Sequence, residues 1–367
     1  MAHEKKAIVT TTIYVPKLLG SHAEDALKHG HDLMFIVVAD KKTPLEAESF
    51  CKELADRTAV RIEYFSVKRQ EEYLSRFPAL KEHIQWNCIQ RRNVGTLYAY
   101  EEGCEVIVTI DDDNFRIDDN YLGAHGVGEE TEVDVVSSST SWINICRMLK
   151  ELKGREFYHR GFPLEKKHAH ETWTAARKKI RPVVNAGLWL GDPDIDAMTR
   201  LHYMADPIEA TEFIYRNRYL VPAKGTWTTF NSQNTALARE VIPAYFLSPK
   251  AGRYDDIWAG YIIKKIADHK NDSIRFGKPI VKQERNPHNY WRDLDAERQG
   301  HALTLRFVEA LASINLAGTD YHACYGEVVE QLPAILFART DIRDDERAFL
   351  DGYFTGMRIW HDVFKTL

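Results

Sequence analysis

Nearly continuous apolar runs alternate with amphipathic segments along the first half of the chain. Residues 7–12, 33–39 and 106–110 consist largely of β-branched and other apolar residues, which is typical of strands covered on both faces in a parallel sheet. Residues 44–57 place apolar side chains at helical spacing behind a proline near the first turn. Strands that alternate with helices predict an α/β fold with a mostly parallel sheet flanked by helices.

The same reading assigns weaker elements between these runs. A helix is expected over residues 21–30, with Ser21 and Glu24 as a capping box and Gly30 as its stop. Strands are expected over 60–65 and 133–137, and a helix over 73–84. The polar, basic stretch 154–181 predicts a loop that holds at most one helix.

The last quarter of the chain has helical spacing throughout. Apolar residues recur every three to four positions over 302–314, 321–337 and 344–364. We therefore expect two parts, an α/β ligand-binding domain over residues 1–294 and a helical C-terminal extension over residues 295–367.

Three consecutive acids, Asp111, Asp112 and Asp113, follow the apolar run 106–110. Neighbouring carboxylates repel one another, and a divalent cation would relieve that repulsion. Oxygen ligands at the carboxyl end of a central parallel strand suit Mg²⁺ or Mn²⁺ that carries a diphosphate. The alternative is an acidic turn that caps the next segment.

Other charged residues stand where the expected strands and helices begin or end. Asp40 ends the second strand and could meet a ribose or base, or could be a turn residue. Arg91 and Arg92 precede the acidic cluster and could neutralise phosphates or hold the acids in register, although a solvated helix face is the alternative for one of them. Asp255 and Asp256 open a helix that runs to about residue 269, so simple capping is their alternative role.

Composition removes several classes of function. The chain has 367 residues, 44% of them hydrophobic, and a net charge of −5, which argues against general binding to nucleic acid or anionic membranes. Five scattered cysteines without CxxC spacing argue against a disulfide framework and a zinc site. No apolar run approaches the ~20 residues of a membrane span, and the stretch 1–6 has no signal-peptide core, so we expect a cytoplasmic protein. Neither GxGxxG nor GxxxxGK[ST] occurs.

Four ordered segments carry a resemblance more specific than any single motif. They are Ile-Asp-Asp-Asp at 110–113, Arg-Gly-Phe-Pro at 160–163, Gly-Leu-Trp-Leu at 187–190 with the acidic turn 192–197, and Gly-Arg-Tyr-Asp-Asp-Ile-Trp-Ala-Gly at 252–260. Together the segments resemble the reversibly glycosylated polypeptides, the UDP-arabinopyranose mutase family. The likeness runs from about residue 8 to residue 289. The ends of the first two strands and the helical tail depart from the family pattern.

This resemblance implies a GT-A-like, doubly wound fold that binds a nucleotide sugar through Mn²⁺ or Mg²⁺. By the same likeness, Asp111 and Asp113 are the expected metal ligands, and Arg160 matches the arginine that becomes reversibly glycosylated. Asp255 and Asp256 match acids near the sugar and join Arg160 as catalytic candidates. The candidates for nucleotide-sugar binding are Thr10, Asp40, Arg91, Arg92, Asp112, Trp189 and Arg253.

The favoured function is a metal-dependent enzyme acting on a UDP-sugar, either a pyranose–furanose mutase or a self-glycosylating transferase. One alternative is a glycosyltransferase that passes the sugar to a separate acceptor molecule. Another is an inactive scaffold subunit, against which the intact acids argue. The expected partners are a nucleotide sugar, an acceptor in the transferase reading, and further copies of the chain if it forms a homo-oligomer. Nucleic acid and membrane partners are not expected.

Overall fold

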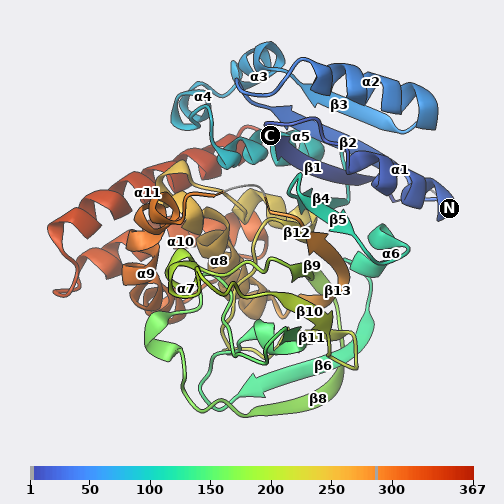
Figure 1. The fold of residues 1–367 in the computed structure, drawn as a ribbon. Helices are drawn as coiled ribbons and strands as arrows, with labels where there is room; N and C mark the ends of the chain where they lie inside the picture. The colour runs from blue at the N-terminus through green and yellow to red at the C-terminus, as the bar shows by residue number, and fades with distance from the viewer. Residues whose placement is uncertain (1–3, 286–287) are drawn as a thin grey trace.

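Four parallel strands form the N-terminal side of one large sheet (Figure 1). Their order is β3 (Arg61–Phe65), β2 (Leu33–Ala39), β1 (Lys6–Thr12) and β4 (Val106–Ile110). β1, β2 and β4 are almost wholly buried, as their apolar sequences predict. The computed structural model describes residues 4–285 and 288–367. Residues 1–3 lie outside the described residues, so half of the stretch 1–6, where no signal-peptide core was expected, has no described structure.

The connections between these strands place helices on both faces of the sheet. The chain moves outward from β1 to β2 and β3 through α1 (Leu19–Lys28) and α2 (Glu46–Thr58), then returns past β1 to β4. Right-handed crossovers in opposite directions put the connecting helices on opposite faces. On the return, α5 (Arg92–Glu101) lies so close to the sheet that a Cβ at Gly95 would meet Val9 and Val38. The strand order therefore reverses between β1 and β4, where ligands bind in doubly wound sheets.

Antiparallel pairs enter the sheet beyond β4. β12 (Asn234–Ala238) runs antiparallel to both β4 and β9 (Pro182–Gly191), and β13 (Ser273–Gln283) runs parallel to β9. The far edge continues through β11 (Tyr219–Pro222), β6 (Thr131–Ser138) and β8 (Trp173–Ile180), and β5 (Asn114–Arg116), β7 (Leu149–Glu151) and β10 (Ala210–Phe213) are accessory strands. Since β9 and β13 point the same way as β1–β4, most of the central strands share one direction. The predicted α/β class is confirmed.

The remaining helices of the first 270 residues are shorter, apart from α8. They are α3 (Val67–Leu74), α4 (Pro78–His83), α6 (Tyr121–His125), α7 (Ala197–His202) and α8 (Asp255–Lys270), with 3₁₀ turns η1 (Ile89–Arg91), η2 (Ile145–Met148), η3 (Leu164–Lys166), η4 (Arg239–Ala244) and η5 (Pro249–Tyr254).

Three long helices, α9 (Tyr290–Ser313), α10 (Tyr321–Phe337) and α11 (Asp344–Phe364), confirm the predicted helical C-terminal region. They gather beside α8 in Figure 1. Trp258 of α8 stacks on Phe307 of α9 with ring centroids 4.3 Å apart, and Trp360 of α11 stacks on Phe246. The expected boundary at residue 294 falls inside α9. Among the described residues, no helix is long and apolar enough to cross a membrane.

Three local predictions are wrong. α1 begins at Leu19, and Ser21 donates back to the carbonyl of Leu18 instead of capping the helix. The expected helix over 73–84 is divided between α3 and α4, because Pro78 starts a new helix. Residues 154–181 include β8, an exposed edge strand paired with β6. With both faces of β8 solvated, its sequence lacks the apolar alternation that would identify a strand.

Candidate functional site

A cleft of about 560 Å³ opens at the carboxyl ends of β1 and β4. The end of β1, the segment 87–92, the acids after β4, the segment 232–233 and the segment 252–256 line it. Ten of the twelve candidate site residues are among its lining residues: Asp40, Arg91, Arg92, Asp111, Asp112, Asp113, Arg160, Arg253, Asp255 and Asp256. The fold thus brings together side chains from five separate stretches of sequence at the switch point.

The acids after β4 are only partly buried. Asp111 has a quarter of its side chain exposed and accepts a hydrogen bond from Arg92 Nη2 at 2.6 Å. Asp112 Oδ2 accepts from Thr12 Oγ1 at 2.5 Å, and Asp113 Oδ1 accepts from Asn114 Nδ2 at 2.9 Å. Burial raises the pKa of Asp112. The hydrogen bond from Thr12 lowers this pKa and the charge of Asp111 raises it, and the net pKa lies above its usual value.

Asp111 and Asp113 fit a divalent cation that is shared with a ligand. They supply two carboxylates at a cleft wall, and Mg²⁺ or Mn²⁺ commonly binds one or two carboxylates plus phosphate oxygens and water. The described chain also has two groups of three ligand-type side chains whose atoms converge within 4.8 Å, and neither group includes these acids. A cation at Asp111 and Asp113 would therefore need further ligands, such as phosphate oxygens and water.

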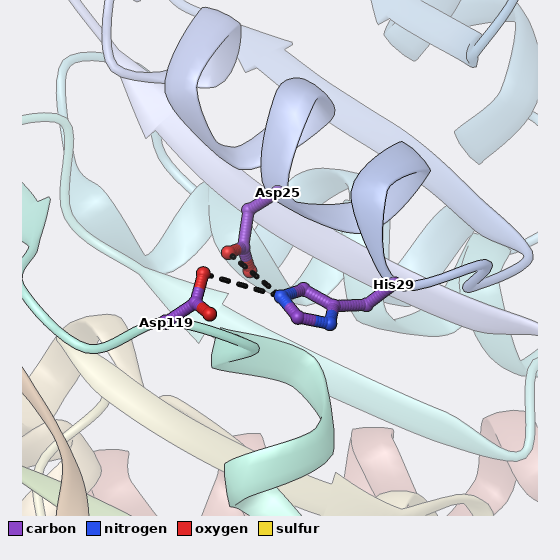
Figure 2. Close-up of side chains that lie close together, drawn as sticks. All are labelled: Asp25, His29 and Asp119. Carbon is purple, nitrogen blue, oxygen red and sulfur yellow. Dashed lines mark hydrogen bonds and ion pairs between the residues drawn. The ribbon is translucent and has the colours of Figure 1, made fainter.

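One of those groups is shown in Figure 2, where Asp25 of α1 and His29, the residue after α1, face Asp119. Asp119 lies 2.7 Å from Lys28 Nζ, and Asp25 lies 3.2 Å from Arg116 Nη1. Since two cations already balance the acids and none of the three side chains lines the cleft, the group is best described as an ion-pair cluster that holds α1.

Arg160 lies in the cleft wall, 7% exposed, between two carboxylates. Asp194 accepts from Nε and Nη2 at 3.0 Å each, and Asp256 accepts from Nη1 at 3.1 Å and Nη2 at 3.4 Å. The backbone carbonyl of Arg253 also accepts from Nη1. Every N–H group of the guanidinium therefore has an acceptor. Burial lowers the pKa of Arg160, but the two carboxylates outweigh burial and raise it further above its usual range.

The glycine after Arg160 fits a close approach to α8. Gly161 has a φ of +88°, and a Cβ there would lie 2.3 Å from Ile257 Cγ2. Its carbonyl accepts from Tyr261 Oη at 2.9 Å. The loop is therefore pressed against the helix that carries Asp255 and Asp256.

Asp255 and Asp256 do not use their side chains to cap α8. No side-chain cap bond is present at that helix start. Asp256 Oδ2 instead accepts from the Ser232 backbone at 2.8 Å and its hydroxyl at 3.1 Å, besides its pair with Arg160. Asp255 Oδ2 accepts from Gln90 Nε2 at 2.8 Å. Burial, followed by repulsion from Asp256, raises the pKa of Asp255 to about 7.

Neither arginine of the segment 91–92 lies on a solvated helix face, which corrects that alternative. Arg92 is fully buried and links Asp111 to Ser232, whose carbonyl and hydroxyl both accept at 2.8 Å. Arg91 is also buried and lies over the Trp86 ring, 3.4 Å from its centroid. Arg92 therefore holds the acidic cluster in register.

The other predicted contacts are placed as follows. Asp40 lines the cleft, but its carboxylate accepts from the backbone N–H groups of Asn87 and Cys88 at 2.9 and 3.2 Å and so shapes that loop. Thr10 is buried and its hydroxyl donates to the Thr11 carbonyl, outside the cleft. Trp189 is 1% exposed and lines a separate small cavity. Thr10 and Trp189 therefore do not contribute to the cleft surface.

Several residues that line the cleft or contact its candidate residues were missed as candidates. Asp194 holds Arg160, Gln90 binds Asp255, Ser232 joins Arg92 to Asp256, and Arg285 lines the cleft. Asp194 stands in the acidic turn 192–197, one of the four segments with a resemblance, so its presence there was a usable signal. The other three lie in segments without a distinctive pattern.

Comparisons with known proteins agree on one family. The family described as "Reversibly glycosylated polypeptide" matches residues 79–361. A probable UDP-arabinopyranose mutase 1 from Pisum sativum is 30% identical over 236 residues, which are 62% of this chain and 60% of that protein. UDP-arabinopyranose mutase 3 from Arabidopsis thaliana is 27% identical over 273 residues, 71% of this chain and 68% of that protein. This chain thus spans about three fifths of the length of the pea protein.

Among solved structures, the chain is similar to the mannosyltransferase PcManGT from Pyrobaculum calidifontis in complex with GDP-Man and Mn²⁺. The TM-score is 0.40 at 11% sequence identity, and the match covers 99% of this chain and 87% of that one.

Proposed function

The chain belongs to the reversibly glycosylated polypeptide family, and from that premise we propose that it rearranges the sugar of a UDP-sugar while the sugar is held on Arg160. The observation that carries this proposal is the position of Arg160 in the cleft wall, buried between Asp194 and Asp256. The names of the relatives make UDP-arabinopyranose the first substrate to test.

In this proposal the diphosphate lies against the carboxyl end of β4. A Mn²⁺ or Mg²⁺ ion held by Asp111 and Asp113 would stabilise the charge that develops on the β-phosphate as it leaves. Arg92 keeps Asp111 in place through its 2.6 Å contact. The lining segment 87–89, fixed by Asp40, would face the nucleoside.

The first covalent step joins a guanidinium nitrogen of Arg160 to the anomeric carbon. Nη1 gives a proton to Asp256, whose Oδ1 lies 3.1 Å away, and then attacks the carbon as the nucleoside diphosphate leaves with the bonding electrons. A guanidinium is a poor nucleophile because it is protonated at neutral pH. The buried carboxylate in direct contact is therefore essential to the proposal.

The ring then opens and recloses without loss of atoms. A double bond forms between Nη1 and the anomeric carbon as Nη1 gives up its remaining proton and the ring oxygen gains one. In reclosure another sugar hydroxyl attacks that carbon and gives up its proton as Nη1 regains one. We assign both proton transfers to Asp255, because a pKa of about 7 lets a carboxyl donate and accept near neutral pH. The diphosphate finally displaces Arg160, which recovers its proton.

A second function is favoured by the same geometry. All five N–H groups of Arg160 donate hydrogen bonds to protein acceptors. This is expected of an arginine that only holds the residues of the cleft wall in position. In that case the cleft would transfer the sugar to a separate acceptor, with Asp255 or Asp256 as the base.

Intact-mass spectrometry separates the two functions. The protein is incubated with UDP-arabinopyranose and Mn²⁺, and a rearranging enzyme gains the mass of one pentose, which excess UDP removes. Arg160→Lys should lose the adduct and still bind UDP, because lysine keeps the positive charge but lacks the planar guanidinium group. No adduct with any UDP-sugar tested, or an adduct that persists in Arg160→Lys, contradicts the proposed role of Arg160.

A further inference from the structure

We propose that Glu297, on helix α9 of the C-terminal region, is a positioning residue that fixes Arg160 by holding two separate chain segments against it. The inference deepens the proposed function and rests on the role that the proposal gives to Arg160. Glu297 does not line the cleft, and it is fully buried.

The first segment is the turn that precedes α8. Glu297 Oε1 accepts from Arg253 Nε at 2.8 Å. The backbone carbonyl of Arg253 in turn accepts from Arg160 Nη1, and Asp256 follows three residues later. One oxygen of Glu297 therefore anchors the segment that presents both a carbonyl and a carboxylate to Arg160.

The second segment is the acidic turn after β9. Glu297 Oε2 accepts from the Ala197 backbone N–H at 2.7 Å. Three residues earlier, Asp194 binds the Arg160 guanidinium at two points, and its carbonyl accepts from the Arg160 backbone N–H at 2.8 Å. The other oxygen of Glu297 therefore anchors the remaining wall around Arg160.

Close packing around Glu297 leaves these segments little freedom. A Cβ at Gly252 would lie 2.5 Å from the Ala296 carbonyl, and one at Gly300 would lie 2.2 Å from the Tyr254 ring. Tyr254 Oη also lies 3.1 Å from His301 Nδ1. The turn before α8 therefore rests directly on α9.

Each acid of the cluster around Glu297 already has a cationic partner. The Glu297 carboxylate forms a ligand-type group with Asp196 and His301, but Lys167 Nζ lies 2.7 Å from Asp196, and Arg253 pairs with Glu297 and, at 3.7 Å, with Asp293. These ion pairs favour a positioning network over a metal site.

The test compares two buried glutamates of the helical region. Glu297→Gln keeps the shape but offers one neutral acceptor oxygen to two donors, so one anchor breaks and the other weakens because its acceptor has lost its charge. Glu346→Gln is the matched control: Glu346 is fully buried, accepts from Arg306 at 3.1 Å and from the Arg343 backbone at 2.9 Å, and none of the three residues lines the cleft. Both variants lose a buried charge pair.

Two measurements are made on the full chain. In hydrogen exchange, Glu297→Gln should speed exchange in both 192–200 and 250–257, and Glu346→Gln in neither. In a single turnover with UDP-arabinopyranose and Mn²⁺, Glu297→Gln should slow adduct formation about tenfold or more, whereas its Kd for UDP changes less than about threefold. Glu346→Gln should leave the adduct rate of the folded protein unchanged.

The two measurements also separate the two proposals. Unchanged exchange in either segment, or equal acceleration by Glu346→Gln, overturns the positioning role whatever the enzyme does. A wild-type protein that forms no adduct refutes the rearrangement, while the exchange data still decide whether Glu297 holds the two segments. Faster exchange with an unchanged adduct rate would show that Arg160 does not depend on this anchor, and overturns the inference.

Discussion

Asp111–Asp113 after β4 and Asp255–Asp256 at the start of α8 face the same cleft, yet they differ in burial and in partners. The side chains after β4 are partly exposed, and Asp111 has Arg92 as its ion-pair partner. Asp255 and Asp256 are buried, and Asp256 accepts from Arg160 and from two groups of Ser232. Ser232 also accepts from Arg92, so it joins the two clusters.

In the proposed function this difference divides the work between the two clusters. A partly exposed carboxylate can exchange water for a cation at modest cost, because it is not fully desolvated. A buried carboxylate locked in several hydrogen bonds cannot, and its environment instead shifts pKa values and orients a partner. The same acid type therefore suits ion binding after β4 and proton chemistry at α8.

The largest effect is expected at Asp256. Asp256→Asn removes the charge that faces Arg160, so stability should fall by about 3 kcal/mol and turnover by a factor on the order of 10² or more. Chemical denaturation and steady-state kinetics on the folded fraction measure the two effects. A loss below about 1 kcal/mol with intact turnover would show that neither stability nor catalysis depends on the charge of Asp256.

The next effect is expected at the end of β4. Asp113→Ala should weaken Mn²⁺-dependent binding of UDP about tenfold or more while the Tm moves by about 2 °C or less, since a partly exposed acid contributes little to the fold. Calorimetric titration with and without Mn²⁺ measures it. Asp119→Ala, in the cluster of Figure 2, is the control and should bind UDP as the wild type does. If Mn²⁺ raises the affinity for UDP equally in Asp113→Ala and in the wild type, the ion does not bind at this cluster.

The smallest effect is a pH dependence at Asp255. Because its folded-state pKa of about 7 lies above the unfolded value, its contribution to stability is present in acid and is lost as pH rises from about 4 to about 7. Asp255→Asn removes that loss. We therefore compare the Tm of the variant minus the Tm of the wild type at two pH values. This difference should be about 2 °C larger at pH 8 than at pH 5, for a change in unfolding free energy on the order of 1 kcal/mol. The opposite trend would contradict a raised pKa.

Sequence patterns identified the parallel strands and most of the cleft, for a physical reason. A doubly buried strand such as 106–110 must be apolar, and its carboxyl end lies at the ligand edge, so the acids 111–113 could be placed at that edge from the residue pattern. The exposed strand β8 has no such constraint and was missed. Gln90 and Ser232 were missed because their contacts join positions more than 20 residues apart, 165 residues in the case of Gln90.

The helical tail shows a further limit of pattern reading. Helical periodicity predicted α9–α11, but not that Glu297 would face Arg253 and Ala197. A buried carboxylate at one position of an amphipathic helix resembles a solvated one in sequence. Only the packing of α9 on the turn before α8 distinguishes them.

The tight fit of Gly161 against Ile257 also affects how relatives should be judged. Any side chain there would collide with α8, so selection for folding alone would keep this glycine, even in a descendant that had stopped reacting with sugars. A conserved Arg-Gly-Phe-Pro glycine is thus a marker of ancestry and of packing. When activity is inferred across genomes, the proposed function makes Arg160, Asp113 and Asp256 the positions to inspect, because a pseudoenzyme could change them and retain the rest of the signature.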